Sequence, residues 1–185
     1  MIISLSKLAK ELKATAPDLI TRPMGRRFYN KVESMFSIIQ DGETVLLDFE
    51  SIRVVDSSFI AEFIMKLIFK SQSDKPRFYI KLSALSDTTI MNIEAVFKSY
   101  HSMNNSKIAV ITDTLIDKSY FIGQLSEKGK DVINYLNINK TATIDELASF
   151  LEEETGFTRI LLEELHDLGV LKTDSGSNAT LYCAL

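Results

Sequence analysis

The chain has 185 residues, of which 45% are hydrophobic and 25% are charged, with a net charge of −4. This composition suits a globular protein that buries a full core in one large domain or two small ones. The sequence carries no signal peptide and no apolar run near the roughly 20 residues that cross a bilayer, so we expect no membrane partner. The single cysteine, Cys183, excludes an internal disulfide framework and favours a cytoplasmic location.

Charge is divided unevenly along the chain. Residues 1–125 carry 16 Lys and Arg against 14 Asp and Glu, a net of +2, whereas residues 126–185 carry 5 against 11, a net of −6. Affinity for nucleic acid comes largely from neutralised phosphates, so the acidic second part disfavours non-specific binding to DNA.

The first elements are two amphipathic helices separated by a short strand. Leucines recur on one face of residues 4–13 with lysines opposite, which predicts a short helix packed on the edge of a domain. Residues 18–21 follow as a short strand. A second helix is expected over residues 25–39, with its apolar stripe formed by Phe28, Val32, Met35, Phe36 and Ile39.

Three arginines stand at the start of this second helix, namely Arg22, Arg26 and Arg27. Helix N-termini and guanidinium groups both favour anions, so the cluster is a candidate anion-binding site. The alternative is a solvated surface cluster. A nucleotide-binding loop is not indicated, because the repeated glycines and the Lys-Ser/Thr pair of such loops are missing.

The most informative stretch is residues 44–64. A buried strand at residues 45–47 ends at Asp48, and a second apolar pair, Val54-Val55, stops at Asp56-Ser57-Ser58. Asp and Ser accept the free amides of a first helical turn, so these three residues are expected to begin a helix. That helix, residues 58–71, is apolar nearly all round and should be the central one.

These residues resemble the centre of the STAS domains of bacterial anti-sigma factor antagonists. The resemblance implies an α/β fold and a phosphate-accepting serine, which by position is Ser57. Phe59 stands where those domains usually have glycine. A closer resemblance, over about residues 17–112, is to the divergent STAS-like family of unknown function, and rests on residues 21–27, Leu47-Asp48-Phe49 and residues 59–62. The alternative reading is that Asp56, Ser57 and Ser58 only cap the helix.

Strands and helices continue to alternate up to residue 112. We expect a strand over residues 78–82, a helix beginning at Ser86 and a buried strand over residues 108–111. Alternation of this kind favours a largely parallel sheet covered by helices, so residues 1–112 are predicted to form one α/β domain. Residues 113–125 show no clear periodicity and are predicted to be a connector.

Residues 126–185 have a different pattern, with three helices followed by two short strands around a polar loop. Thr143 and Glu146 have capping-box spacing at the start of the second helix. Residues 162–171 look like the end of a recognition helix that runs into the first wing strand. The segment therefore resembles a small winged helix-turn-helix domain of the α+β class.

A helix that reads DNA needs basic and amide side chains on its exposed face. The third helix offers Arg159, with Thr155 and Thr158 as weaker candidates, against acidic residues on the same helix and a run of three glutamates before it. Residues 160–162 are all apolar, and a helix with one buried face cannot bury all three. We expect Leu161 to be exposed and to suit a protein contact.

The sequence gives little indication of a catalytic site. His101 and His166 lie far apart without a second ligand at metal spacing, and Cys183 reads as a packed small residue. We therefore expect no enzyme activity, metal or cofactor. The sequence favours a regulatory protein that binds an unidentified protein. It leaves open whether the protein acts as a partner-switching module and whether it forms a homodimer. A winged-helix transcriptional regulator that binds DNA is the alternative.

Overall fold

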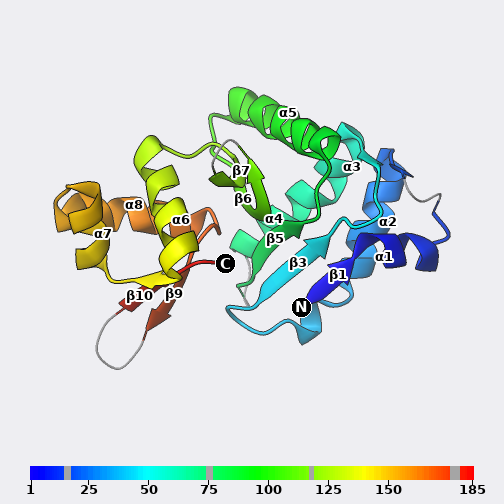
Figure 1. The fold of residues 1–185 in the computed structure, drawn as a ribbon. Helices are drawn as coiled ribbons and strands as arrows, with labels where there is room; N and C mark the ends of the chain where they lie inside the picture. Colours follow the sequence, from blue (N-terminus) through cyan, green and yellow to red (C-terminus); the bar gives the residue numbers. More distant parts are fainter. Residues whose placement is uncertain (15–17, 74–76, 117–118, 176–179) are drawn as a thin grey trace.

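The computed structural model describes residues 1–14, 18–73, 77–116, 119–175 and 180–185 (Figure 1). It is a mixed α/β structure with a mostly parallel central sheet flanked by helices, as the sequence predicted. Among the described residues the main sheet has five strands, in the order β1-β3-β5-β6-β7. Their bounds are β1 Ile2–Ser4, β3 Thr44–Asp48, β5 Tyr79–Ser83, β6 Ala109–Ile116 and β7 Ser119–Gly123.

The helices of this part of the chain form a layer over one face of the main sheet. Each strand has alternate side chains pointing to opposite faces, and Val45, Leu47, Ile80 and Leu82 share a core with the helices. None of the described helices is long and apolar enough to span a membrane. The helices are α1 Leu5–Glu11, α2 Arg22–Glu33, the 3-10 helix η1 Phe36–Ile38, α3 Ser57–Glu62, α4 Ile64–Ser73 and α5 Asp87–Asn104.

Two features of the sheet were missed at the level of sequence. β1 pairs in parallel with β3, with Ile3 opposite Leu47, yet three residues at the start of a chain give no readable pattern. The pair Val54-Val55 forms β4, which leaves the main sheet and pairs in parallel with β2 (Asp18–Leu19). A bidentate contact from Arg53 to Asp18, at 2.9 and 2.5 Å, reinforces this small sheet.

The apolar helix expected over residues 58–71 is two helices. α3 ends at Glu62, Phe63 has φ −116° and ψ −67°, and α4 begins at Ile64. Most of the apolar side chains of both helices are buried, and Phe59, Phe63 and Phe28 pack edge to face or tilted with ring centroids 5.1 to 5.8 Å apart.

The predicted connector at residues 113–125 is largely regular structure. β6 extends to Ile116 and pairs antiparallel with β7, so most of this segment is the edge hairpin of the main sheet. The periodicity was hidden because the hairpin has a register irregularity between Ile111 and Ile116 and because its residues near the sheet are buried on both faces.

Residues 126–185, here called the C-terminal unit, contain in their described part three helices and a three-stranded antiparallel sheet in the order β8-β10-β9. Thr143 and Glu146 form the predicted capping box at the start of α7. Residues 1–123 are called the sheet unit. The elements of the C-terminal unit are α6 Glu127–Asn139, β8 Thr141–Ala142, α7 Ile144–Leu151, α8 Thr155–Asp167, β9 Lys172–Ser175 and β10 Thr180–Cys183.

The β6–β7 hairpin contributes side chains to the hydrophobic cores of both units. On β6 and β7, Val110 and Ile122 point into the core of the sheet unit, whereas Ala109, Ile111 and Phe121 belong to the core of the C-terminal unit. Alternate side chains of one hairpin thus complete two hydrophobic cores. The C-terminal unit covers the second face of the main sheet at the β6–β7 end.

Polar contacts from the end of α4, from the residue pair before β5 and from β5 itself extend this interface. Lys81 Nζ donates to the carbonyl of Leu185 at 2.7 Å, and Gln72 Nε2 donates to the carbonyl of Leu168 at 2.8 Å. Arg77 donates to the carbonyl of His166. These contacts come from the sheet unit and end on the carboxyl end of α8 and the chain terminus, so the carboxyl end of α8 is held while its first turns face away.

Candidate functional site

The site begins where α2 crosses α3. Gly25 is buried on α2, and a Cβ atom there would lie 2.9 Å from the Cβ of Glu62 and 3.1 Å from the carbonyl oxygen of Phe59. Only glycine allows so close an approach of the two helices. The two short motifs at residues 21–27 and 59–62 that carried the sequence resemblance therefore meet in space.

Glu62 is the charged residue at this crossing. It is only 6% exposed and lies within ion-pair distance of three cations. Arg26 makes a fork with both carboxylate oxygens at 3.2 Å, Arg22 Nη1 donates to Oε1 at 3.2 Å, and Lys66 Nζ lies 2.7 Å from Oε2. The hydrogen bonds from Arg26 first, and then from Lys66, lower the pKa of Glu62 to about 2.

Asp56 joins the same two helices at their amino ends. Its Oδ1 accepts the amide hydrogen of Phe59 at 2.7 Å and caps α3, while its Oδ2 accepts the amide hydrogen of Thr21 at 3.2 Å. Thr21 precedes α2 and has φ +79°, a conformation that is costly for a β-branched residue. One carboxylate therefore fixes both helix starts, and Asp56 rather than either serine is the capping residue.

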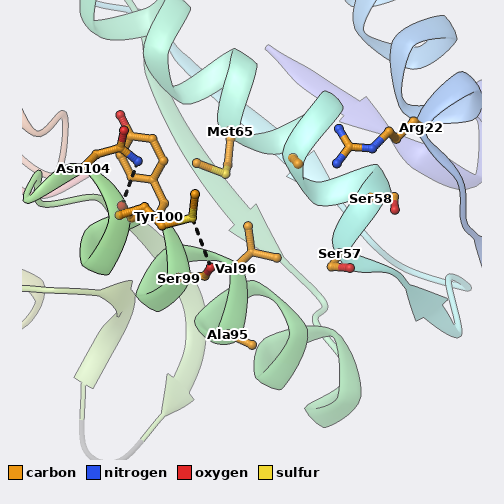
Figure 2. A pocket seen from close by; sticks show the side chains of 11 residues that line it. Arg22, Ser57, Ser58, Met65, Ala95, Val96, Ser99, Tyr100 and Asn104 are labelled. Atoms are coloured by element: carbon orange, nitrogen blue, oxygen red, sulfur yellow. Dashed lines mark hydrogen bonds between the residues drawn. The ribbon is translucent and has the colours of Figure 1, made fainter.

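Ser57 and Ser58 stand at the edge of an open groove of about 440 Å³. Ser57 is exposed and Ser58 is half-buried. Figure 2 shows the two serines and Arg22 at one end of the groove, Tyr100 and Asn104 at the other, and Met65 and Val96 between them. The groove runs between α3–α4 and α5, with a mainly apolar lining completed by Ala61, Ala95, Ser99 and Met103.

The structure separates the three arginines that the sequence grouped as an anion site. Arg22 and Arg26 pair with the internal carboxylate of Glu62, whereas Arg27 donates to the carbonyl of Leu12 in the neighbouring segment. Of the three, Arg22 lines the groove beside Ser57 and Ser58. The cluster first serves to hold α2 against α3 and against the segment after α1.

Glu62 is the residue of this site that the sequence did not single out. A signal was available, because an acidic residue on a helix that is otherwise apolar needs a compensating charge, and Lys66 four residues later can supply one. What could not be read was that α2 would lie across α3, because that depends on the tertiary fold.

The C-terminal unit places its predicted DNA-reading residues unequally. Thr155 and Arg159 are exposed, but Thr158 is fully buried and its hydroxyl donates to the carbonyl of Glu154 at 3.1 Å, so Thr158 cannot reach a base. Leu161, expected to be exposed, is 5% exposed, and its neighbour Ile160 is 68% exposed instead. The exposed position of the helix therefore lies one residue before the predicted one.

Two titratable groups lie in the interface between the units. Burial, with the charge of Arg77 adding to it, lowers the pKa of His166 below its usual value. Burial also lowers the pKa of Lys172, whose ammonium lies 5.3 Å from the ring centroid of Tyr79. Across the described residues, no group of three or more His, Cys, Asp or Glu side chains is placed to hold a metal ion.

The fold and the α2–α3 crossing define an α/β protein with a mostly parallel sheet and a groove beside a capped central helix. Residues 24–89 match the family model of a STAS-like domain of unknown function (DUF4325). That stretch runs from α2 to the first turn of α5 and contains Gly25, Asp56 and Glu62. It lies inside the range of the sequence resemblance. No curated protein matches the chain.

Proposed function

We propose that this chain is a non-enzymatic regulatory protein that acts by binding another protein in the groove between α3–α4 and α5. The observation that carries the proposal is the groove itself, which is open, mainly apolar and bordered by the exposed Ser57. Methionine side chains such as Met65 and Met103 adapt to different apolar partners. We place this action in the cytoplasm, in keeping with the free thiol of Cys183.

Ser57 is the residue through which binding would be switched. A separate kinase would transfer the γ-phosphoryl group of ATP to Ser57 Oγ, with ADP as the leaving group and the hydroxyl proton taken by the kinase. The resemblance to STAS domains supports this position, and so does the structure around it, because Asp56 already caps α3 and leaves the Ser57 side chain at the groove edge. A phosphate there would add up to about two negative charges to the surface that the partner meets.

The binding test uses a photo-crosslinking amino acid at Met103, which lines the groove and is 81% exposed. The matched control is the same amino acid at Met91, 67% exposed on the same helix but outside the groove lining. We expect a covalent adduct with one discrete protein from position 103 and none from position 91 in the native cell. Equal adducts from both positions, or none from either, would contradict the proposal.

The switch is tested separately. Phosphopeptide mass spectrometry of the chain from its own cell is expected to find phosphate on Ser57, and Ser57→Asp is expected to reduce crosslinking from position 103 while Ser57→Ala preserves it. An unmodified Ser57 under several growth conditions, with equal crosslinking in both variants, would remove the switch and leave the groove proposal standing.

For the C-terminal unit we infer a winged-helix-like module that serves protein contact. Support comes from the element order of helix, strand, two helices and two strands, and from the placement of β10 between β8 and β9. The acidic residues near the start of α8 favour a protein over DNA as its partner.

DNA binding is the second candidate, favoured by the exposed Arg159 and Thr155 on the first turns of α8. It is tested by fluorescence anisotropy of mixed duplex DNA with the full chain at low and near-physiological salt. We expect no binding, even in the range of about 10⁻⁴ to 10⁻⁶ M that is typical of non-specific contacts. Affinity that falls steeply with salt and is lost in Arg159→Ala would establish the DNA candidate instead.

A further inference from the structure

The outward face of α8 presents apolar side chains to solvent. Ile160 is 68% exposed and Phe157, one turn before it, is 46% exposed, while Leu161, Leu162 and Leu165 of the same helix are buried. Phenylalanine and isoleucine at positions i and i+3 form a continuous strip on a helix surface. Lys128 lies over one part of the Phe157 ring, with its nitrogen 5.7 Å from the ring centroid.

Acidic side chains lie before and after this strip, and the exposed Arg159 stands between Phe157 and Ile160 in the sequence. Glu152 and Glu154 are exposed just before α8, and Glu163 is exposed one turn after Ile160. The exposed charges beside the apolar strip are therefore mainly acidic, with Glu152, Glu154 and Glu163 against Arg159. Such a surface complements a partner that offers basic groups around an apolar contact.

The opposite charge gathers at the other end of the same molecule. Residues 1–31 carry 7 Lys and Arg against 2 Asp and Glu, a net of +5. Lys7, Lys10 and Lys13 are exposed, as are Arg26 and Arg27 of α2, and Ile20 between the two helices is 43% exposed. Figure 1 shows α1 and α2 at one end of the molecule and α7 and α8 at the other.

We propose that the outward face of α8 binds the α1–α2 end of a second copy of this chain. The two ends lie on opposite sides of one molecule, so they cannot meet within it, but they can meet between molecules. The contact is heterologous, because each copy uses a different surface. Repetition of such a contact produces chains or rings rather than a symmetric dimer.

The first measurement is sedimentation equilibrium of the full chain over a range of protein concentrations. At about 0.01 M salt, where the screening length is about 30 Å, we expect the weight-average mass to rise with concentration beyond twice the 20.9 kDa of one chain. At about 1 M salt, where that length is about 3 Å, we expect a return to the monomer. A monomer at every concentration and salt would overturn the proposal.

Two variants block one end each. Glu152→Lys with Glu163→Lys reverses two of the acidic charges beside the strip, and Lys7→Glu with Lys10→Glu reverses exposed charges on α1. Each variant alone is expected to remain monomeric at low salt, because like charges then face each other. An equimolar mixture is expected to associate again at low salt, because the two unchanged ends carry opposite charges and so do the two reversed ends. Failure of the mixture to associate would contradict the pairing of these two ends.

The apolar strip is tested apart from the charges. Ile160→Ser is expected to weaken low-salt association by at least tenfold, whereas Met91→Ser, at a side chain that is 67% exposed elsewhere, is expected to leave it unchanged. Circular dichroism checks that both variants are folded. Equal behaviour of the two variants would mean that α8 does not form the contact.

Discussion

A side chain on Gly25 would collide with Glu62, since a Cβ at residue 25 would lie 2.9 Å from the Cβ of Glu62. The nearest other atoms belong to the backbone of Phe59, which cannot move without shifting α3. The crossing of α2 and α3 is thus built on a missing side chain at one position and a buried charge at the other.

Gly25→Ala is expected to lower the free energy of unfolding by about 1 to 3 kcal/mol, the usual cost of overpacking. Urea denaturation followed by circular dichroism measures it. Gly156→Ala is the matched control, since Gly156 is also helical and has nothing within 4 Å of its would-be Cβ. The control should be neutral or stabilising by up to about 1 kcal/mol. Equal effects at both positions would mean that the close crossing is not required.

Asp56→Ala removes two hydrogen bonds, one to the first turn of α3 and one to Thr21. We expect a loss of about 1 to 2 kcal/mol of unfolding free energy, near the upper range for a helix cap. Ser57→Ala, one residue further on, should cost less than about 0.5 kcal/mol because Ser57 is exposed. A Ser57→Ala variant as unstable as Asp56→Ala would show that the serine supports the helix instead.

Glu62→Gln leaves Arg22, Arg26 and Lys66 without their carboxylate. We expect the free energy of unfolding to fall by about 1 to 3 kcal/mol at neutral pH. The loss is no larger because the three cations are half-exposed and screened by water. The folded-state pKa of Glu62, about 2, lies below its ordinary value of 4.5. Its stabilisation is therefore full above the ordinary value and declines as the pH falls toward 2.

The check is urea denaturation of wild type and Glu62→Gln from neutral pH down to about pH 2.5. The difference in unfolding free energy should shrink as the pH falls through the window between 4.5 and 2. Glu94→Gln, at an exposed position on α5, is the control and should track the wild type. A gap between wild type and Glu62→Gln that stays constant over this window would contradict the ion-pair network.

His166 should make the interface between the two units sensitive to mild acid. Burial keeps the pKa of His166 below 6.5, with Arg77 adding to the effect and Asp167 opposing it. The unfolded chain therefore takes up a proton before the folded chain does, so stability falls as the pH drops below 6.5. The effect is largest once the pH reaches the folded-state value.

We expect the wild type to lose more unfolding free energy than His166→Gln between about pH 7 and about pH 5, measured by urea denaturation. His101→Gln, in α5 and outside the interface, should keep the wild-type slope. If all three proteins show the same slope, the burial of His166 does not control the contact.

The layered α/β architecture was readable because its signals are local. Short apolar runs predicted the strands β3, β5 and β6. Asp56 and Thr143 indicated where the helices that they cap begin. Pairing was not readable, since the departure of β4 from the main sheet depends on β2, which lies more than thirty residues earlier.

The site divides in the same way. Ser57 and Ser58 could be singled out because they follow a cap and precede an apolar helix. The groove beside these serines could not be predicted from the sequence. One of its sides is formed by α5, which approaches α3 and α4 only in the folded chain. The exposed position on α8 was misplaced by one residue, from Ile160 to Leu161, because three consecutive apolar residues leave the phase of a helix open.

The hairpin of β6 and β7 couples the unfolding of the sheet unit to that of the C-terminal unit. Loss of residues 126–185 would strip Ala109, Ile111 and Phe121 of their apolar cover and leave a flat, water-exposed sheet face. Unfolding of either half exposes apolar surface of the other half and destabilises it. Heating should therefore produce a single unfolding transition. A truncated chain that ends near residue 125 would tend to aggregate. The C-terminal unit could be replaced in evolution only by another module that covers the same face of the β6–β7 hairpin.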